Sequence, residues 1–157
     1  LPCDRAPQEF SLVRQRCDND CGLAALATIA VCHGYTYTYD DLADQITLDH
    51  RGTDLLTLLR LANRVGFLAQ GIEASYDDLP NCAFPLIAHI RHWVGGGHFI
   101  VIYRWTPTHI VLGNPAVGLR TMSRRVFNRR STGYFLTFKP HARLITAETG
   151  NSETGNF

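Results

Sequence analysis

The sequence predicts an α+β fold in which an N-terminal helical lobe packs on a C-terminal, mainly antiparallel sheet. Two observations predict it: apolar residues recur at helical spacing as far as Gly66, whereas from Phe67 short apolar runs are separated by Gly, Pro and Asn. Helices followed by strands are typical of α+β domains, here with a cleft between two lobes. With 157 residues, the chain has the length of one domain.

The first helix is predicted directly after a polar segment that ends at Asp20. Asn19 or Asp20 supplies the N-cap, and the apolar residues that follow extend the helix through about Cys32. Gly34 can end it in the left-handed conformation. Cys21 therefore stands in the first turn of this helix.

The remaining elements follow from periodicity and turn residues. A short second helix is predicted over Asp40–Ile46, and a third is capped by Thr53 and ends near Gly66. Strands are predicted at Phe67–Ile72, Pro85–Ile90, His98–Arg104, His109–Leu112 and Tyr134–Phe138.

Composition excludes several classes of protein. A formal charge of +1 gives no case for nucleic-acid binding, and no apolar run approaches the ~18–20 residues of a membrane span, so the domain is expected to be soluble. An odd number of cysteines without a regular framework favours a reducing compartment. The cysteines are Cys3, Cys17, Cys21, Cys32 and Cys82.

The two ends of the chain differ from its centre. Residues 1–14 are expected to be an irregular lead-in, and residues 141–157 a polar linker or tail that follows a domain over residues 1–140. Leu1 is not an initiating methionine and opens no signal peptide, so a domain excised from a longer protein is expected.

Cys21 is a candidate nucleophile. Backbone N–H groups and the dipole at a helix N-terminus favour the thiolate and can lower a cysteine pKa from about 8.5 to between 3.5 and 7.5. Further on, His98 follows three glycines at the start of a predicted strand, and Asn114 stands before Pro115. Cysteine, then histidine, then Asn or Asp is the chain order of papain-like hydrolases.

Each of these residues also has a structural interpretation. Cys21 can be a small buried residue of an Ala-rich helix, His98 a structural histidine, and Asn114 part of an Asn-Pro turn. His92 competes with His98 as the base, although it stands in a predicted loop. The order of the three residues favours catalysis over these alternatives.

Gln15 stands six residues before Cys21, residues 20–22 form an Asp-Cys-Gly triplet, His98 opens an apolar strand, and an x-Pro turn ends the next strand. Together these four features resemble the peptidase C39 family, the peptidase domains at the N-terminus of bacterial exporters of bacteriocins. The resemblance spans Gln8 to Pro140 and includes the segment from Gly52 to Ala74.

The resemblance implies a papain-like thiol endopeptidase. Cys21 would attack the peptide carbonyl, His98 would serve as base and acid, Asn114 would orient the imidazole, and Gln15 would bind the oxyanion. The substrate would be a precursor peptide, cut after a Gly-Gly, Gly-Ala or Gly-Ser pair that ends an amphipathic helical leader. Proteolysis would need neither metal nor cofactor.

The resemblance also implies partners and a location. Attached transmembrane and nucleotide-binding domains would export the released core peptide, with ATP used only there. The domain would lie on the cytoplasmic side of the bacterial membrane.

Two rival functions remain open. C39 domains usually have Asp where this chain has Asn114, and a neutral amide orients an imidazole without stabilising its charge. A non-catalytic domain that only recognises leaders is therefore one alternative, although Cys21 argues against it. A papain-like amidase or transglutaminase is another, because fold and triad do not fix the substrate.

Two further groups of residues have no assigned role. Cys17, Cys32 and His33 suggest zinc, but no second pair of ligands with metal-site spacing follows. Cys17 can also form a disulfide on oxidation. The arginine cluster is either a solvated face or a contact for anionic lipid, a nucleotide-binding domain or an acidic leader; its members are Arg120, Arg124, Arg125, Arg129 and Arg130.

Overall fold

The computed structural model describes residues 10–48, 52–92 and 95–140. The helices are α1 (Cys21–Cys32), α2 (Tyr39–Ala43), α3 (Leu55–Arg64) and α4 (Arg124–Arg130), with a 3₁₀ helix η1 at Tyr76–Asn81. The strands are β1 (Phe67–Glu73), β2 (Leu86–Arg91), β3 (Gly97–Trp105), β4 (His109–Asn114), β5 (Gly118–Ser123) and β6 (Ser131–Pro140). Cys3, the N-terminal lead-in up to residue 9 and the tail predicted over 141–157 lie outside the described residues.

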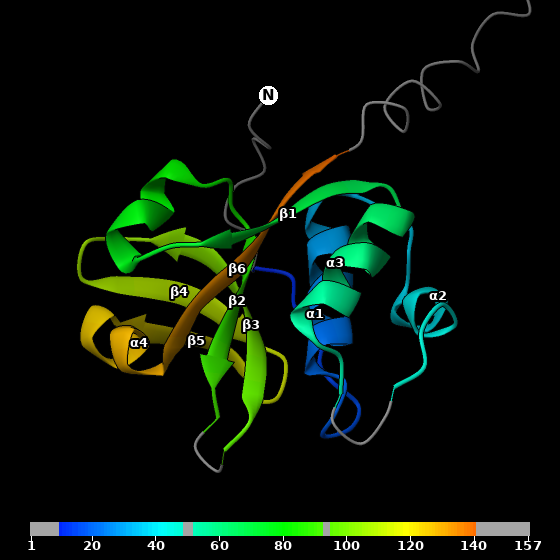
Figure 1. The fold of residues 1–157 in the computed structure, drawn as a ribbon, viewed down its shortest axis with the longest axis horizontal. Coiled ribbons are helices and arrows are strands. Elements are labelled where there is room, and N and C mark those ends of the chain that lie inside the picture. Colours follow the sequence, from blue (N-terminus) through cyan, green and yellow to red (C-terminus); the bar gives the residue numbers. More distant parts are fainter. Residues whose placement is uncertain (1–9, 49–51, 93–94, 141–157) are drawn as a thin grey trace, which may run out of the picture.

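The six strands form one antiparallel sheet in the order β1-β6-β2-β3-β4-β5. Helices α1, α2 and α3 lie together beside it, and α4 lies at the far end of the sheet (Figure 1). The predicted α+β fold, with N-terminal helices packed on an antiparallel sheet, is confirmed.

Helix α1 is a core helix, because its Ala and Leu residues are buried on all sides. It ends as the sequence predicts: Gly34 has φ +75°, and the N–H of Tyr35 donates to the carbonyl of Ala30 over 2.9 Å. Asp20 occupies the N-cap position, but its side chain makes no capping hydrogen bond with the helix.

The predicted bounds of the second helix and the predicted cap of the third helix need correction. Helix α2 begins at Tyr39 and ends at Ala43, three residues before the predicted end. Helix α3 is capped by Asp54 instead of Thr53, since the Asp54 carboxylate accepts the N–H of Thr57 over 2.7 Å.

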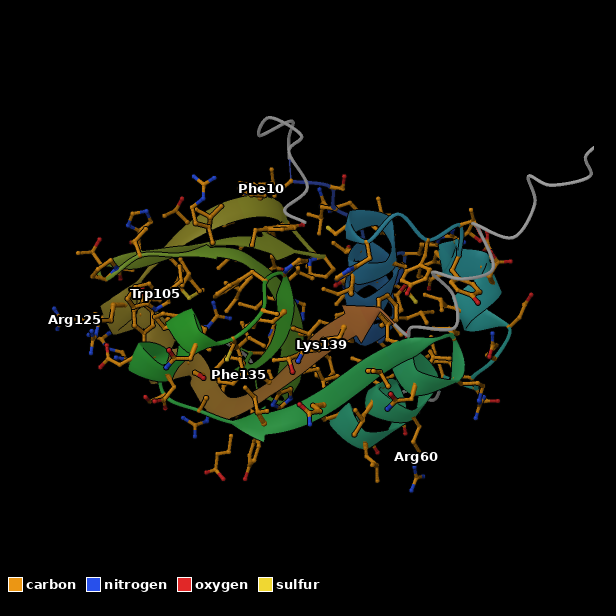
Figure 2. The ribbon with its side chains drawn as sticks, turned by 90° about the horizontal axis from the view of Figure 1, so that it is seen from above. Phe10, Arg60, Trp105, Arg125, Phe135 and Lys139 are labelled. Atoms are coloured by element: carbon orange, nitrogen blue, oxygen red, sulfur yellow. The ribbon has the colours of Figure 1, made fainter. Side chains whose placement is uncertain are left out.

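Three elements were not predicted from the sequence. They are η1, β5 and α4, all short and rich in polar residues, so that neither helical nor alternating apolar periodicity marks them. Ser123 caps α4 by accepting the N–H of Val126 over 3.3 Å. Four of the five clustered arginines lie on this helix, and Figure 2 shows Arg125 at the end of the molecule opposite Arg60 of α3.

The sheet carries a buried core on each face. One core joins α1 and α3 to the β3 residues Phe99 and Val101, and the other encloses Ile100 and Ile102 with η1 and the α4 residue Phe127. Successive residues of a strand face opposite sides, so β3 contributes to both cores. Among the residues described, no helix has the length and hydrophobicity that a membrane span requires.

Candidate active site

Cys21 is the first residue of α1, and its sulfur lies against the start of β3. The backbone N–H groups of Phe99 and Gly22 lie near the sulfur and favour its thiolate form. The ring of Phe99 packs on Gly22 so closely that a Cβ there would stand 3.1 Å from it. The glycine after Cys21 therefore lets the thiol approach the strand.

The surroundings of Cys21 favour the thiol over the thiolate. Burial raises its pKa, the negative charge of Asp20 raises it further, and the backbone N–H groups of Phe99 and Gly22 offset only part of this. This direction is opposite to the one expected from the helix N-terminus alone. The sequence predicted the helix correctly but not that the thiol would be buried beside a carboxylate.

Asp20 is fully buried and organises the loop before Cys21. Its carboxylate accepts the N–H of Arg16 at 2.8 Å, the N–H of Cys17 at 3.1 Å and the hydroxyl of Tyr39 at 2.5 Å. Burial raises the pKa of Asp20, but these hydrogen bonds outweigh it and hold the pKa below its ordinary value. Asp20 therefore connects the loop, α2 and the start of α1 as an anion.

His98 and Asn114 lie together on neighbouring strands. Nε2 of His98 is 2.7 Å from Oδ1 of Asn114, which also accepts the N–H of Ala116 at 3.0 Å. Because the Ala116 N–H needs an acceptor, the oxygen of the Asn114 side-chain amide, and not its nitrogen, must face both Ala116 and His98. Nε2 of His98 therefore carries the hydrogen, and Nδ1 is left as the acceptor.

His98 is 5% exposed, and its surroundings favour the neutral ring. Burial lowers its pKa, and the hydrogen bond with Asn114 raises it by less. His92 packs edge-on against His98, with ring centroids 5.7 Å apart. His92 therefore lies beside the predicted base, at the turn between β2 and β3.

The sulfur of Cys21 lies beside the backbone of Phe99, the residue after His98, but the described side chains of Cys21 and His98 share no hydrogen bond. Cys21 lines a pocket of about 370 Å³ with His89, Gly97 and Phe99. His98 and Asn114 line a separate pocket of about 390 Å³. Catalytic hydrogen bonds are often long or poorly aligned until substrate binds, so this arrangement does not disqualify the pair.

Gln15 reaches the same region from the N-terminal segment. Its backbone N–H donates to the carbonyl of Pro115 over 3.0 Å, which places it beside the turn that follows Asn114. Its side-chain Nε2 donates to the carbonyl of Cys17 over 2.9 Å. Its Oε1 is buried without a hydrogen-bond partner among the described residues. One of the two N–H groups of the Gln15 side-chain amide thus donates to the carbonyl of Cys17, and the second can donate to a ligand.

The zinc interpretation of Cys17, Cys32 and His33 does not fit the geometry. Cys17 precedes α1, whereas Cys32 is its last residue and His33 follows it, so about 16 Å of helix separates Cys17 from the other two. Across residues 10–48, 52–92 and 95–140, no group of three or more His, Cys, Asp and Glu side chains is placed to hold a metal ion.

The arginine cluster is partly paired. Arg124 forms a bidentate ion pair with Asp77, at 2.7 and 2.8 Å, and Nε of Arg130 donates to the carbonyl of Arg91. These contacts tie α4 to η1 and to the end of β2.

Three features of the site were missed from the sequence. They are the pairing of Asp20 with Tyr39, the N–H of Phe99 at the sulfur, and His89 in the pocket of Cys21. His89 stands in an apolar run, and no spacing marks it. Only the pairing of β2 with β3 brings it to the thiol.

Comparison with curated proteins identifies relatives of two kinds. The chain is 28% identical over 138 residues to the mesentericin-Y105 transport/processing ATP-binding protein MesD of Leuconostoc mesenteroides, covering 85% of the chain but 19% of that protein. It is 32% identical over 127 residues to an uncharacterised protein of Methanothermobacter thermautotrophicus, covering 80% of the chain and 85% of that protein. The chain thus spans about a fifth of the transport protein but most of the archaeal one.

Solved structures share the fold. The peptidase domain of Streptococcus ComA, a bifunctional ABC transporter, superimposes with a TM-score of 0.78 at 27% identity, over 85% of this chain and all of that chain. A double-glycine-motif protease in complex with its leader peptide superimposes with a TM-score of 0.76 at 24% identity, over 84% of this chain and 92% of that one. The Peptidase C39 family model matches residues 9–143, and this chain belongs to that family.

Proposed function

We propose that this protein is a cysteine endopeptidase that removes the leader from ribosomal precursor peptides after a Gly-Gly, Gly-Ala or Gly-Ser pair. The observation that carries the proposal is the arrangement of Cys21, His98 and Asn114: a thiol at a helix N-terminus, next to the strand of an imidazole whose ring is oriented by an amide oxygen. Family membership and the activities named for the relatives support the same class of reaction.

The proposed chemistry begins from neutral groups. Nδ1 of His98 takes the proton as the sulfur of Cys21 attacks the carbonyl carbon after the second small residue. The carbon–nitrogen bond then breaks, and His98 gives its proton to the departing amine. Water, deprotonated by His98, hydrolyses the thioester and releases the leader as an acid.

Gln15 would stabilise the oxyanion of the tetrahedral intermediate. The Gln15 N–H that does not donate to Cys17 is one proposed donor, and the backbone N–H of Cys21, in the first turn of α1, is the second. A charge that develops only during reaction is what such fixed donors stabilise best.

The leader would dock beside His98. The pocket next to His98 and Asn114 is lined by apolar side chains, among them Leu112, Val117 and Met122, with Arg120 and Arg130 at its wall. Val117 is 46% exposed, so its side chain is accessible to a ligand in this pocket. Apolar residues of an amphipathic helix suit this groove, and acidic residues next to them suit the arginines.

Export would be coupled to cleavage in a longer protein. The MesD and ComA relatives are transport proteins by name, and this chain corresponds to about a fifth of their length. We propose transmembrane and nucleotide-binding domains as the partners of this one, with ATP used by them alone.

A second candidate function is leader binding without cleavage. One observation favours it: the described side chains of Cys21 and His98 share no hydrogen bond and line different pockets. In that case the domain would deliver precursors to an exporter uncut.

One experiment separates the two functions. Synthetic leader–core peptides with Gly-Gly, Gly-Ala, Gly-Ser or Val-Val at the cut site are incubated with the reduced protein, and products are identified by mass spectrometry. The peptidase predicts a single cut after each small pair and none after Val-Val. Binding of the Gly-Gly peptide without any cut would establish the recognition module instead.

A further inference from the structure

His89 lies near the thiol of Cys21, but it has no role in the proposed catalytic triad. It is paired opposite Phe99 in the β2–β3 ladder, and the two ring centroids are 5.0 Å apart. Phe99 packs on Gly22, next to Cys21, so His89 lies on the face of the sheet that carries the thiol. His89, Phe99 and Cys21 line the same pocket of about 370 Å³.

The ring of His89 is held against Gly97, the residue before His98. A Cβ at Gly97 would stand 2.1 Å from Nε2 of His89, a distance that no side chain tolerates. Glycine at 97 therefore makes room for this nitrogen at the wall of the pocket. His89 also contributes to the electrostatic environment of His98.

Hydrogen bonding fixes which nitrogen of His89 carries the proton. The hydroxyl of Thr132 donates to the carbonyl of His89 over 3.1 Å, and the same hydroxyl is 3.0 Å from Nδ1. Because a hydroxyl has one hydrogen, it can only accept from Nδ1–H. Nε2 is thus a hydrogen-bond acceptor, and it has no partner among the described residues. Burial lowers the pKa of His89, in keeping with a neutral ring.

We propose that Nε2 of His89 binds a main-chain N–H of the substrate next to the cut site. This inference rests on the proposed function. A pair of glycines offers no side chain to recognise, so its backbone must supply the contacts that position it. A preformed acceptor on a rigid strand, within the pocket of the nucleophile, supplies one of them.

A double-mutant cycle between protein and peptide tests this contact. The protein carries Cys21→Ala, so that Kd is measured without turnover, with or without His89→Phe. The Gly-Gly leader–core peptide is used as the amide or as depsipeptides in which an ester removes one N–H at a time, at the two glycines and at the residue before them. Binding is followed by calorimetry at pH 7.5.

At one of the three positions, the ester is expected to weaken binding about 3- to 12-fold with His89 present and to have no effect with His89→Phe. Equal weakening in both proteins at all three positions would overturn the contact. Thr132→Val leaves Nε2 in place but removes the hydroxyl that fixes the proton on Nδ1, so the ester effect should become smaller in this variant without being lost. His89→Leu replaces His89→Phe if circular dichroism shows that the phenylalanine variant is unfolded.

This experiment distinguishes a failure of the proposed function from a failure of the His89 contact. If the Cys21→Ala protein does not bind the amide peptide at all, the proposed recognition of double-glycine leaders is wrong. If it binds and the ester effects are independent of His89, only the assignment of Nε2 is wrong.

Discussion

The imidazole of His98 donates its Nε2 hydrogen to the side-chain oxygen of Asn114 over 2.7 Å, and the N–H of Ala116 holds that oxygen in place. The hydrogen bond leaves Nδ1 of His98 unprotonated, which is the form that a base requires. An aspartate at 114 would fix the same ring orientation and would add a negative charge. The neutral amide thus supplies orientation alone.

Asn114→Ala is expected to lower kcat about 10- to 100-fold with little change in KM, because the ring of His98 loses its orientation. Asn114→Asp should remain active and should move the acid limb of kcat/KM to higher pH, since a carboxylate raises the pKa of His98. Steady-state kinetics on a Gly-Gly leader peptide between pH 5 and 9 measure both effects. Wild-type rates in Asn114→Ala would show that the hydrogen bond has no role in turnover.

Burial and the negative charge of Asp20 disfavour the thiolate of Cys21, so the pKa of this thiol is expected to lie above the ordinary cysteine value. The rate of alkylation of Cys21 by iodoacetamide, followed by peptide mass spectrometry, should therefore rise only at alkaline pH. Asp20→Asn removes the nearby charge and should shift the rise to lower pH. A rise centred near pH 5 would indicate a resting thiolate–imidazolium pair and would contradict the neutral mechanism.

Asp20→Asn is also expected to destabilise the fold, by about 1–3 kcal/mol at pH 7, because a buried acceptor of three hydrogen bonds is replaced in part by a donor. The folded-state pKa of Asp20 lies below 3.8, so the carboxylate stabilises the fold above that pH and the contribution is lost as pH falls below it. Urea unfolding at pH 7 and pH 3 should show a difference between variant and wild type that narrows in acid. Asp18→Asn, an exposed position in the same loop, is the matched control. An equal loss in both variants would show that Asp20 has no special role.

Gln15→Ala is expected to lower kcat about 100-fold, with a smaller effect on KM, since the oxyanion forms only after binding. The side chain also donates to the carbonyl of Cys17, so thermal stability is measured in parallel. Gln15→Glu keeps the size of the side chain but removes the donor, and it should be as inactive as the alanine variant. Full activity of Gln15→Glu would remove Gln15 from the oxyanion site.

The sequence predicts the framework of this fold because its signals are local. The Ala-rich helix that ends at Cys32 and the apolar strand that begins at Gly97 both lie within a residue of where the pattern places them. Cysteine, histidine and asparagine in chain order likewise predict that His98 and Asn114 meet, since they stand on strands joined by one turn. These predictions needed no knowledge of how distant segments pack.

Long-range packing decides what the sequence does not predict. The direction of the pKa shift of Cys21 depends on burial under β3 and on a carboxylate held by the hydroxyl of Tyr39. His89 reaches the thiol only through strand register, because a shift of one residue would point it to the opposite face. Helix α4 was missed because its polar residues have no apolar periodicity, and its position is fixed by Phe127 in the core and by the ion pair of Arg124 with Asp77.

Cleavage of a leader peptide after a small pair of residues is proposed to depend on the thiol of Cys21. The most direct measurement compares wild type, Cys21→Ala and the exposed-thiol control Cys17→Ser on one Gly-Gly leader–core peptide under reducing conditions, with products resolved by mass spectrometry. Wild type and Cys17→Ser should release a free leader that ends in Gly-Gly, whereas Cys21→Ala should bind the peptide and leave it intact. The same cut made by Cys21→Ala would show that Cys21 is not the nucleophile.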